Sequence, residues 1–328
     1  MNDFQKQLLA DARSVVVIQA SNPDGDSLGS SLGLEDILTE LGKKVSLYCN
    51  VDMPKYLRYA DGWDRVTSEF DVHADLAIIV DSTSDTLLSK ALETPYIRHY
   101  LETHPVLVLD HHGEVDSTLT FPHELIIDPD AVATGELIYR LTKENNWPLT
   151  GAGAEALMIA ILADSLGLTT EATTATSIHT VGELVERGAN PARIELKRRD
   201  LMRKSPEILR YKAQLIERIE YHLDGTLALV HIPWEDIQAY SDQYNPSVLV
   251  LDEMRLVEGV DVAIAIKTYP DGRLTGKLRT NKPVADKIAG YFGGGGHVYS
   301  AGFRVYEAYD QVVRELLDAT SKALQETA

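Results

Sequence analysis

The stretch "VVVIQASNPDGDSLGSSLGLE" (residues 15–35) decides the fold. It begins within the apolar run "SVVVIQA" at 14–20, which is typical of a strand buried on both faces of a sheet. The segment after it carries leucines at helical spacing, and Gly42 suits the C-terminal end of that helix. Asp24 and Asp26 flank a single glycine in the loop between the two elements. The stretch therefore predicts a strand, an acidic loop and a helix.

The rest of the first half repeats this alternation. Further apolar runs predict strands at 44–49, 74–81, 105–110 and 124–128. Helical patterns separate several of these runs, which predicts an α/β fold with a doubly wound, mainly parallel sheet.

The second half differs in pattern. From about residue 133 the chain reads as mostly helical, and the polar segment 191–222 suits a helical linker. Strands return near residue 224, and "PDG" at 270–272 predicts a hairpin turn. We therefore expect a metal-binding domain at 1–190, the linker at 191–222 and a smaller α/β substrate-binding domain at 223–328.

Composition limits the function classes. The 328 residues include 31 basic and 50 acidic ones, a net charge of −19, which disfavours binding to long duplex nucleic acid but permits a small phosphorylated ligand. Cys49 is the single cysteine, which excludes an internal disulfide and a cysteine-based zinc site. Neither a membrane-length apolar run nor a signal-peptide pattern is evident, which predicts a cytoplasmic protein without a membrane partner. The oligomeric state, a homodimer included, is left open.

Acids and imidazoles follow three of the predicted strands. They are Asp24 and Asp26 after the first, Asp81 after "LAIIV", and Asp110, His111 and His112 after "VLVL". The carboxyl ends of parallel strands share one edge of the sheet, where ligands bind. Asp164 lies in an otherwise apolar helical segment, where a carboxylate needs a partner or a metal.

Each of these features alone also fits a turn or a helix N-cap. Together, oxygen ligands with one or two imidazoles suit Mn²⁺ or Mg²⁺. Carboxylates shared between two such ions are a common arrangement for phosphoryl hydrolysis.

Four segments resemble the motifs of the DHH phosphoesterase superfamily, in order: "NPDGDSLGSS", "VDSTS", "LDHH" and "ILADSLG". The segment "VADKIAGYFGGGGHVYSAGF", with "LRT" before it, resembles the DHHA1 domain of that superfamily. The size and layout look most like the NrnA type, which combines nano-RNase activity with 3′-phosphoadenosine 5′-phosphate (pAp) phosphatase activity. The resemblance implies a metal-dependent phosphoesterase acting on short oligonucleotides, pApA-like dinucleotides or pAp. The alternative within the enzyme class is a cyclic-dinucleotide phosphodiesterase.

The resemblance also implies roles in the first domain, with one or two Mn²⁺ (or Mg²⁺) ions. Asp24 and Asp81 would bind the first ion. Asp26, Asp81, His111 and Asp164 would bind the second, with Asp81 bridging. Asp110 would orient His111, and His112 would contact the substrate phosphate or the departing oxygen.

In the second domain the resemblance implies that Arg279 and His297 hold the phosphate of the nucleotide. Lys277 stands beside Arg279, which strengthens that interpretation over a solvated strand residue. Backbone amides of the glycine run, Gly294, Gly295 and Gly296, would approach an anion closely, although the run also suits a flexible linker. Three aromatic residues suit either base stacking or core packing: Tyr291, Phe292 and Tyr299.

One residue departs from the family pattern. The family motif has a histidine four residues before its first aspartate, and here that position is Ala20. Gln19 is adjacent but points to the opposite face of a strand, and Ser21 or Asn22 could supply an oxygen instead. The first ion could bind without the histidine, could bind only with substrate, or the site could have become a one-metal or nucleotide-binding site.

Overall fold

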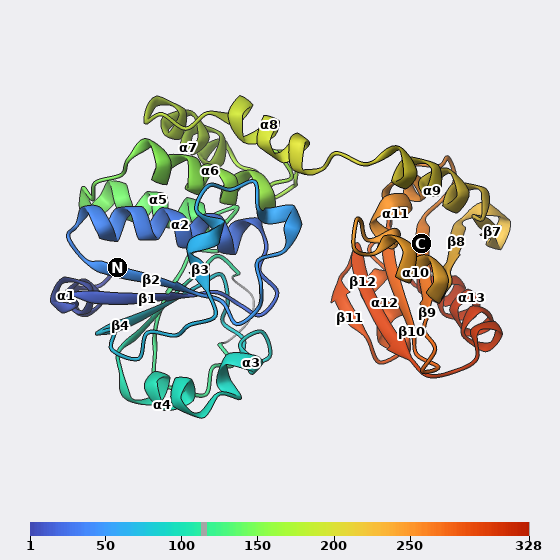
Figure 1. Cartoon of the computed structure of the whole chain (residues 1–328), viewed down its shortest axis with the longest axis horizontal. Coiled ribbons are helices and arrows are strands. Elements are labelled where there is room, and N and C mark those ends of the chain that lie inside the picture. The colour runs from blue at the N-terminus through green and yellow to red at the C-terminus, as the bar shows by residue number, and fades with distance from the viewer. Residues whose placement is uncertain (113–116, 328) are drawn as a thin grey trace. The chain divides into compact units, whose positions relative to one another are not determined.

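The computed structural model describes residues 1–112 and 117–327. The chain divides into two compact units, Met1–Arg203 and Lys204–Ala328 (Figure 1). In the described part, no helix is both long enough and apolar enough to span a lipid bilayer.

The first unit contains a six-stranded sheet in which every neighbouring pair is parallel. Its order is β3-β2-β1-β4-β5-β6. The strands are β1 (Ser14–Ile18), β2 (Lys44–Tyr48), β3 (Val66–Thr67), β4 (Leu76–Val80), β5 (Val106–Asp110) and β6 (Glu124–Ile127). The predicted doubly wound, mainly parallel sheet is confirmed, and the order of strands reverses direction between β1 and β4.

Helices cover both faces of this sheet (Figure 1). The helices of this unit are α1 (Asp3–Asp11), α2 (Gly25–Glu40), α3 (Ser89–Leu92), α4 (Pro95–Thr103), α5 (Thr134–Asn145), α6 (Gly151–Asp164), α7 (Ala175–Glu186) and α8 (Pro191–Leu201). Of these, α7 and α8 lie beyond α6, away from the sheet (Figure 1). Val15 and Val17 of β1 pack in the core under α2, α5 and α6, whereas Val16 and Ile18 pack in the core with α3 and α4. Burial on both faces explains why β1 is a continuous apolar run.

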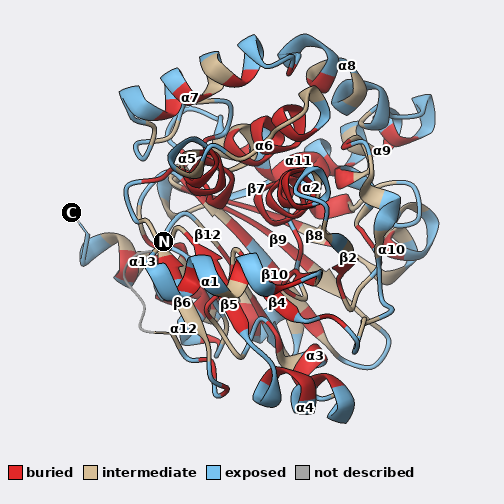
Figure 2. Ribbon diagram, turned by 90° about the vertical axis from the view of Figure 1, so that its left-hand side faces the viewer, coloured by how far each residue is buried: buried red, intermediate tan, exposed pale blue. Residues whose placement is uncertain are grey.

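Helices α2 and α6 pack unusually close to each other. A Cβ added at Gly29 would lie 2.5 Å from the carbonyl oxygen of Ala156 and 2.7 Å from the backbone nitrogen of Ala160. A Cβ added at Gly25, one turn before, would collide with the Cβ of Ala163. Figure 2 shows α2 and α6 buried along most of their length. Glycine at these positions is therefore what lets the two backbones touch.

The second unit is built on another six-stranded sheet, in the order β11-β12-β10-β9-β8-β7. Its strands are β7 (Glu220–His222), β8 (Leu227–Ile232), β9 (Val262–Thr268), β10 (Leu274–Thr280), β11 (Gly295–His297) and β12 (Ser300–Val305). Only the β8–β9 pair is parallel within this sheet as described. The predicted hairpin joins β9 to β10, and Gly272 in its turn has φ +80°.

The helices of the second unit pack in two groups. They are α9 (Pro206–Glu217), α10 (Trp234–Tyr240), α11 (Pro246–Arg255), α12 (Ala285–Tyr291) and α13 (Tyr309–Gln325). Residues of α12 and α13 form one apolar core with one face of the sheet, and residues of α9, α10 and α11 form another core with the opposite face. Segment 191–222, predicted as a linker, holds two separate helices, α8 in the first unit and α9 in the second.

The close contact between α2 and α6 predicts a cost for Gly29→Ala. The added methyl group meets backbone atoms, which can move only if the helices separate, so we expect a loss of about 1–3 kcal/mol in the free energy of unfolding. The matched control is Gly182→Ala in the middle of α7, where an added Cβ meets nothing within 4 Å. Chemical denaturation should show Gly182→Ala neutral or stabilising; equal effects of both substitutions would contradict the packing argument.

Candidate metal centre

The sequence-predicted acids of the first unit gather at the carboxyl ends of β1, β4 and β5. Asp26 lies in the first turn of α2 after β1, Asp81 directly follows β4, and Asp110 is the last residue of β5. Asp164 ends α6, whose C-terminus reaches the same place because Ala163 packs against Gly25. This edge, next to the reversal in strand order, is where doubly wound sheets bind ligands.

Asp26 is fully buried and held by the start of α5. Its Oδ2 accepts a hydrogen bond from the backbone N–H of Thr134 at 2.7 Å, and its Oδ1 accepts one from that of Gly135 at 3.0 Å. The Ser30 hydroxyl donates a third, at 2.9 Å. These amides are the free donors of a helix N-terminus, so they fix the orientation of the carboxylate.

His111 is the centre of the cluster. Its Nδ1 lies 3.2 Å from the carbonyl oxygen of Ala131, which can only accept, so the Nδ1 atom carries the proton in the neutral ring. Its Nε2 faces three carboxylates: it lies 3.2 Å from Asp164 Oδ2, and 3.7 Å from both Asp26 Oδ2 and Asp81 Oδ1. This is the nitrogen that would bind a metal ion once the ring is neutral. Nε2 is buried, and no hydrogen-bond partner satisfies it in the described structure. A backbone carbonyl on one ring nitrogen and carboxylates around the other are the arrangement of a metal-binding imidazole.

The electrostatics indicate an excess of buried negative charge. Burial, reinforced by the charge of Asp164, raises the pKa of Asp26 to about 6. Burial lowers the pKa of His111, but Asp164 and Asp26 outweigh it and raise that pKa to about 9. An acid that resists ionisation beside an imidazole that retains a proton marks a site that a cation would stabilise.

Asp81 shares this electrostatic environment. Burial, followed by the charges of Asp26 and Asp24, raises the pKa of Asp81 well above its usual value. The Thr134 hydroxyl donates to Asp81 Oδ1 at 3.2 Å. The backbone of Asp81 has φ +59°, a left-handed conformation that is uncommon outside glycine and tends to occur at functional sites.

Asp110 makes a different contact from the one that its predicted role implies. Asp110 contacts His112 rather than His111: its Oδ1 accepts from the backbone N–H of His112 at 3.0 Å and lies 2.7 Å from the His112 Nδ1. The local turn brings the imidazole two residues on back to the carboxylate, while His111 turns toward Ala131. Burial would raise the pKa of Asp110, but these hydrogen bonds lower it, and the same contact raises the pKa of His112. Asp110 therefore stabilises a protonated His112.

In the structure Asp24 caps a helix beside the other predicted ligands. Asp24 is exposed and caps α2, with its Oδ1 accepting from the Ser27 backbone N–H at 3.0 Å. Ala20 is buried, and its carbonyl oxygen accepts a hydrogen bond from the Cys49 thiol. Gln19 is 2% exposed, and neither atom of its side-chain amide has a hydrogen-bond partner in the described structure.

Two groups of ligand atoms are close enough to hold an ion. One comprises Asp26, His111 and Asp164, and the other comprises Asp81, His111 and His112. Asp24 belongs to neither group among the described residues. The unsatisfied Nε2 of His111 and the surrounding carboxylates fit a divalent cation of the Mn²⁺ or Mg²⁺ class.

Three contributors to this site were not predicted from the sequence. Thr134 and Gly135 supply amide and hydroxyl donors to the carboxylates, and Ala131 supplies the carbonyl that orients His111. The Thr-Gly pair at the start of a predicted helix could have indicated this contribution, because the free backbone amides at a helix N-terminus bind carboxylates.

The predicted phosphate-binding residues of the second unit share one region of its sheet. Arg279 pairs in register with Ser300, and Ser300 pairs with His297 on the neighbouring strand. The Arg279 guanidinium donates to the Ser300 hydroxyl and the Leu278 carbonyl, and His297 is exposed. Lys277 is exposed two residues before Arg279.

The glycine run is more ordered than either sequence interpretation expected. The Gly294 amide donates a hydrogen bond to the carbonyl of Ala289 and so ends α12. This hydrogen bond uses one of the backbone amides that were predicted to face an anion. Gly295 and Gly296 belong to the short strand β11. Added Cβ atoms at Gly294 and Gly296 would collide with the backbone of β12, so close strand packing requires glycine there.

The aromatic candidates divide by burial. Phe292 is buried and stacks on Phe303 with ring centroids 4.4 Å apart, so the core-packing interpretation holds for it. Tyr291 and Tyr299 are 61% and 49% exposed and remain candidates for base stacking.

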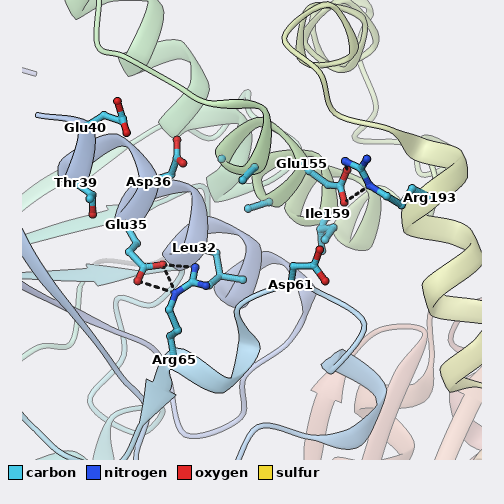
Figure 3. A pocket seen from close by; sticks show the side chains of 13 residues that line it. Leu32, Glu35, Asp36, Thr39, Glu40, Asp61, Arg65, Glu155, Ile159 and Arg193 are labelled. Atoms are coloured by element: carbon cyan, nitrogen blue, oxygen red, sulfur yellow. Dashed lines mark hydrogen bonds and ion pairs between the residues drawn. The ribbon is translucent and has the colours of Figure 1, made fainter.

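A cavity of about 460 Å³ lies elsewhere in the first unit (Figure 3). It is lined by the C-terminal half of α2 and the N-terminal half of α6, whereas Asp26 and Asp164 lie at the other ends of these helices. Arg65 pairs with Glu35 across one side of it, and Arg193 pairs with Glu155 across the other (Figure 3). Because these arginines are already neutralised, the cavity does not suit a phosphate.

Comparison with known protein families gives a match for the first unit. Residues 14–161 match the family model described as the DHH family, N-terminal domain. The match spans β1 to α6 and so includes Asp26, Asp81 and His111. The matched segment, which is less than half of the chain, is therefore similar to the N-terminal domain of the DHH family, as the motifs suggested.

Relatives extend the similarity beyond this domain. The bifunctional oligoribonuclease and PAP phosphatase NrnA of Thermus thermophilus is 28% identical over 309 residues, covering 92% of this chain and 89% of that protein. The Bacillus subtilis protein of the same name is 20% identical, covering 93% of each. The cyclic-di-AMP phosphodiesterase GdpP of Geobacillus thermodenitrificans is 23% identical over 90% of this chain but 45% of its own length.

A solved structure supports the fold of both units. An exopolyphosphatase-related protein from Bacteroides fragilis matches with a TM-score of 0.84 and 20% identity, covering 98% of this chain and 95% of that one.

The contact between α5 and Asp81 predicts the effect of Thr134→Val. The substitution removes the hydroxyl that donates to Asp81 while keeping the side-chain shape and the backbone N–H to Asp26. Loss of a hydrogen bond to a metal-binding carboxylate typically weakens metal affinity by about 10–100-fold. Calorimetric titration with Mn²⁺ measures this.

The matched control is Thr142→Val in the same helix, because the buried Thr142 hydroxyl donates to the Ile138 carbonyl of α5 and not to the predicted metal ligands. Thr142→Val should leave Mn²⁺ affinity unchanged. Equal Mn²⁺ affinity in both variants would show that the Thr134 hydroxyl does not contribute to the metal site.

Proposed function

We propose that this protein is a divalent-metal phosphoesterase of the NrnA type that hydrolyses short oligonucleotides, pApA-like dinucleotides or pAp. The similarity to NrnA proteins over about nine-tenths of the chain supports the substrate class. The arrangement that carries the proposal is the unsatisfied Nε2 of His111 among three carboxylates at the carboxyl edge of the sheet.

Four residues would hold the metal: Asp26, Asp81, His111 and Asp164. We expect Mn²⁺ or Mg²⁺, because carboxylate oxygens dominate the ligand set. Such an ion, when bound, activates water toward phosphorus and stabilises charge on the phosphoryl oxygens. The α5 amides keep Asp26 oriented before the ion arrives, so little reorganisation is needed on binding.

His112 would act on the substrate rather than only on the metal. Its side chain is 51% exposed, and Asp110 favours its protonated form. A protonated imidazole at this edge can donate to a phosphoryl oxygen or to the departing oxygen. In the second unit, Arg279 and His297 would bind another phosphate of the substrate.

A substrate panel tests the proposal: pAp, pApA, a five-nucleotide RNA, cyclic di-AMP and pyrophosphate, each with and without Mn²⁺. We expect hydrolysis of the first three only with metal. Preferential hydrolysis of cyclic di-AMP would favour the alternative that the similarity to GdpP suggests. If the protein bound nucleotides but hydrolysed none of these compounds, the result would favour a nucleotide-binding protein that has lost catalysis because Ala20 replaces the motif histidine.

Asp81→Ala should abolish hydrolysis and most Mn²⁺ binding. The substitution removes an oxygen that faces His111, and it leaves the Thr134 hydroxyl without its acceptor. Steady-state turnover of pAp and a Mn²⁺ titration measure the two effects. The control is Asp64→Ala, which removes an exposed carboxylate distant in sequence from the cluster. If Asp81→Ala retained nearly the turnover of the parent protein, Asp81 would not be a ligand of the catalytic metal.

Ala20→His should raise Mn²⁺ affinity and increase turnover at low Mn²⁺. It restores an imidazole where the family motif has one, and a gain of about 10–100-fold is comparable to known effects of metal-site partners. Because Ala20 is buried, Ala20→Phe controls for crowding by a ring that cannot bind metal. If Ala20→His shows no gain over the parent protein at low Mn²⁺, Ala20 is not a missing ligand.

A further inference from the structure

We propose that the sheet of the second unit holds an additional phosphate beside the Arg279 and His297 position, bound by Lys277 and Lys267, and that this position favours oligonucleotides over pAp. The proposal rests on the proposed function, because it concerns the substrate of the same enzyme.

The relevant cations lie on one face of the sheet. Along β10, Leu274 and Leu278 pack in the core formed with α12 and α13, so the alternate residues Thr275, Lys277 and Arg279 face the other way. Along β9, Ala263 and Ala265 pack in the opposite core, which places Lys267 on the same face as Lys277.

The strand register arranges this face in three rows. Each row runs across neighbouring strands and ends on β9, and the rows are His297–Ser300–Arg279–Ala263, Gly295–Gly302–Lys277–Ala265 and Arg304–Thr275–Lys267. Residues two apart along a strand are separated by about 6.8 Å, which is on the order of the separation of neighbouring phosphates in an extended nucleotide chain. The distance between the Lys277 row and the Arg279 row is therefore similar to the distance between neighbouring phosphates.

The middle row is open as well as positive. On one side of Lys277 its residues are glycines, and an added Cβ at Gly295 would meet nothing within 4 Å. On the other side the row ends at the buried Ala265. Lys277 itself is exposed. A row without side chains beside an exposed ammonium provides room for a phosphate on the sheet surface.

These cations have no acidic partner. The chain carries 50 acidic residues against 31 basic ones, yet among the residues that the structure describes no salt bridge reaches Lys267, Lys277, Arg279 or Arg304. Positive side chains gathered without carboxylates in so acidic a protein indicate a site for an external anion.

Lys267 is the anchored member of the pair. Its ammonium donates to Asn245 Oδ1 at 2.8 Å, and Asn245 caps the N-terminus of α11. Burial, followed by the charge of Lys277, lowers the pKa of Lys267 to about 8. Two ammonium groups that repel each other would both be stabilised by a phosphate between them.

The test measures binding to the full chain in EDTA, so that nothing is hydrolysed. The probes are a five-nucleotide RNA and pAp, and the variants are Lys277→Ala, Arg279→Ala and Lys287→Ala. Lys287 is the matched control: it lies on α12, which packs on the other face of the sheet, and it pairs with Glu326.

We expect Lys277→Ala to raise the Kd for the RNA about tenfold or more, as loss of a charged hydrogen bond does, and to leave the Kd for pAp unchanged. The salt dependence of RNA binding should also fall, by about 0.7 in the slope of log K against log salt for one lost phosphate contact. Arg279→Ala should weaken both ligands, and Lys287→Ala neither.

The outcomes separate the two proposals. If Arg279→Ala weakens both ligands while Lys277→Ala weakens neither, or weakens both equally, the additional phosphate position is refuted and the proposed function stands. If Arg279→Ala affects neither ligand, the phosphate-binding role of the second unit is wrong, and this inference fails with it.

Discussion

The close contact between α2 and α6 is the constraint on which the metal centre depends. Asp26 lies at the start of α2 and Asp164 at the end of α6, so the two carboxylates approach His111 only if the helices cross nearly backbone to backbone. Gly25 and Gly29 permit that crossing. Helix α5 joins the same junction, because an added Cβ at Gly135 would lie 2.5 Å from the Ala160 side chain, which also borders Gly29. Small residues thus set the positions of charged ones.

This packing concentrates negative charge in a place with little water. A folded chain accepts such an arrangement when hydrogen bonds fix the carboxylates and a cation compensates their charge. The backbone amides of α5 fix the carboxylate of Asp26. The neighbouring carboxylates raise the pKa of His111 to about 9, which shows that positive charge is stabilised at this position. In the second unit, Lys267, Lys277, Arg279 and Arg304 lie on one face of the sheet and form no salt bridge among the described residues.

The sequence predicted the elements whose signals are local. The apolar run of β1 and the acids that follow β1, β4 and β5 identified the sheet and its functional edge. Contacts between distant segments were not predictable in this way: the hydrogen bond from Thr134 to Asp26 joins residues 108 apart. The orientation of Asp110 toward His112 depends on the path of a turn, which a motif does not specify. The cap that Asp24 provides to α2 is a local contact, and the prediction that Asp24 binds metal stays a prediction.

A crystal structure of the protein grown with Mn²⁺, with anomalous scattering recorded at the manganese absorption edge, tests the central claim most directly. We predict an anomalous peak at coordination distance from His111 Nε2 and from carboxylate oxygens of Asp26 and Asp164, with the His111 Nδ1 still directed at the Ala131 carbonyl. A Mn²⁺ peak bound elsewhere, or saturating Mn²⁺ with no peak at His111, would contradict the account.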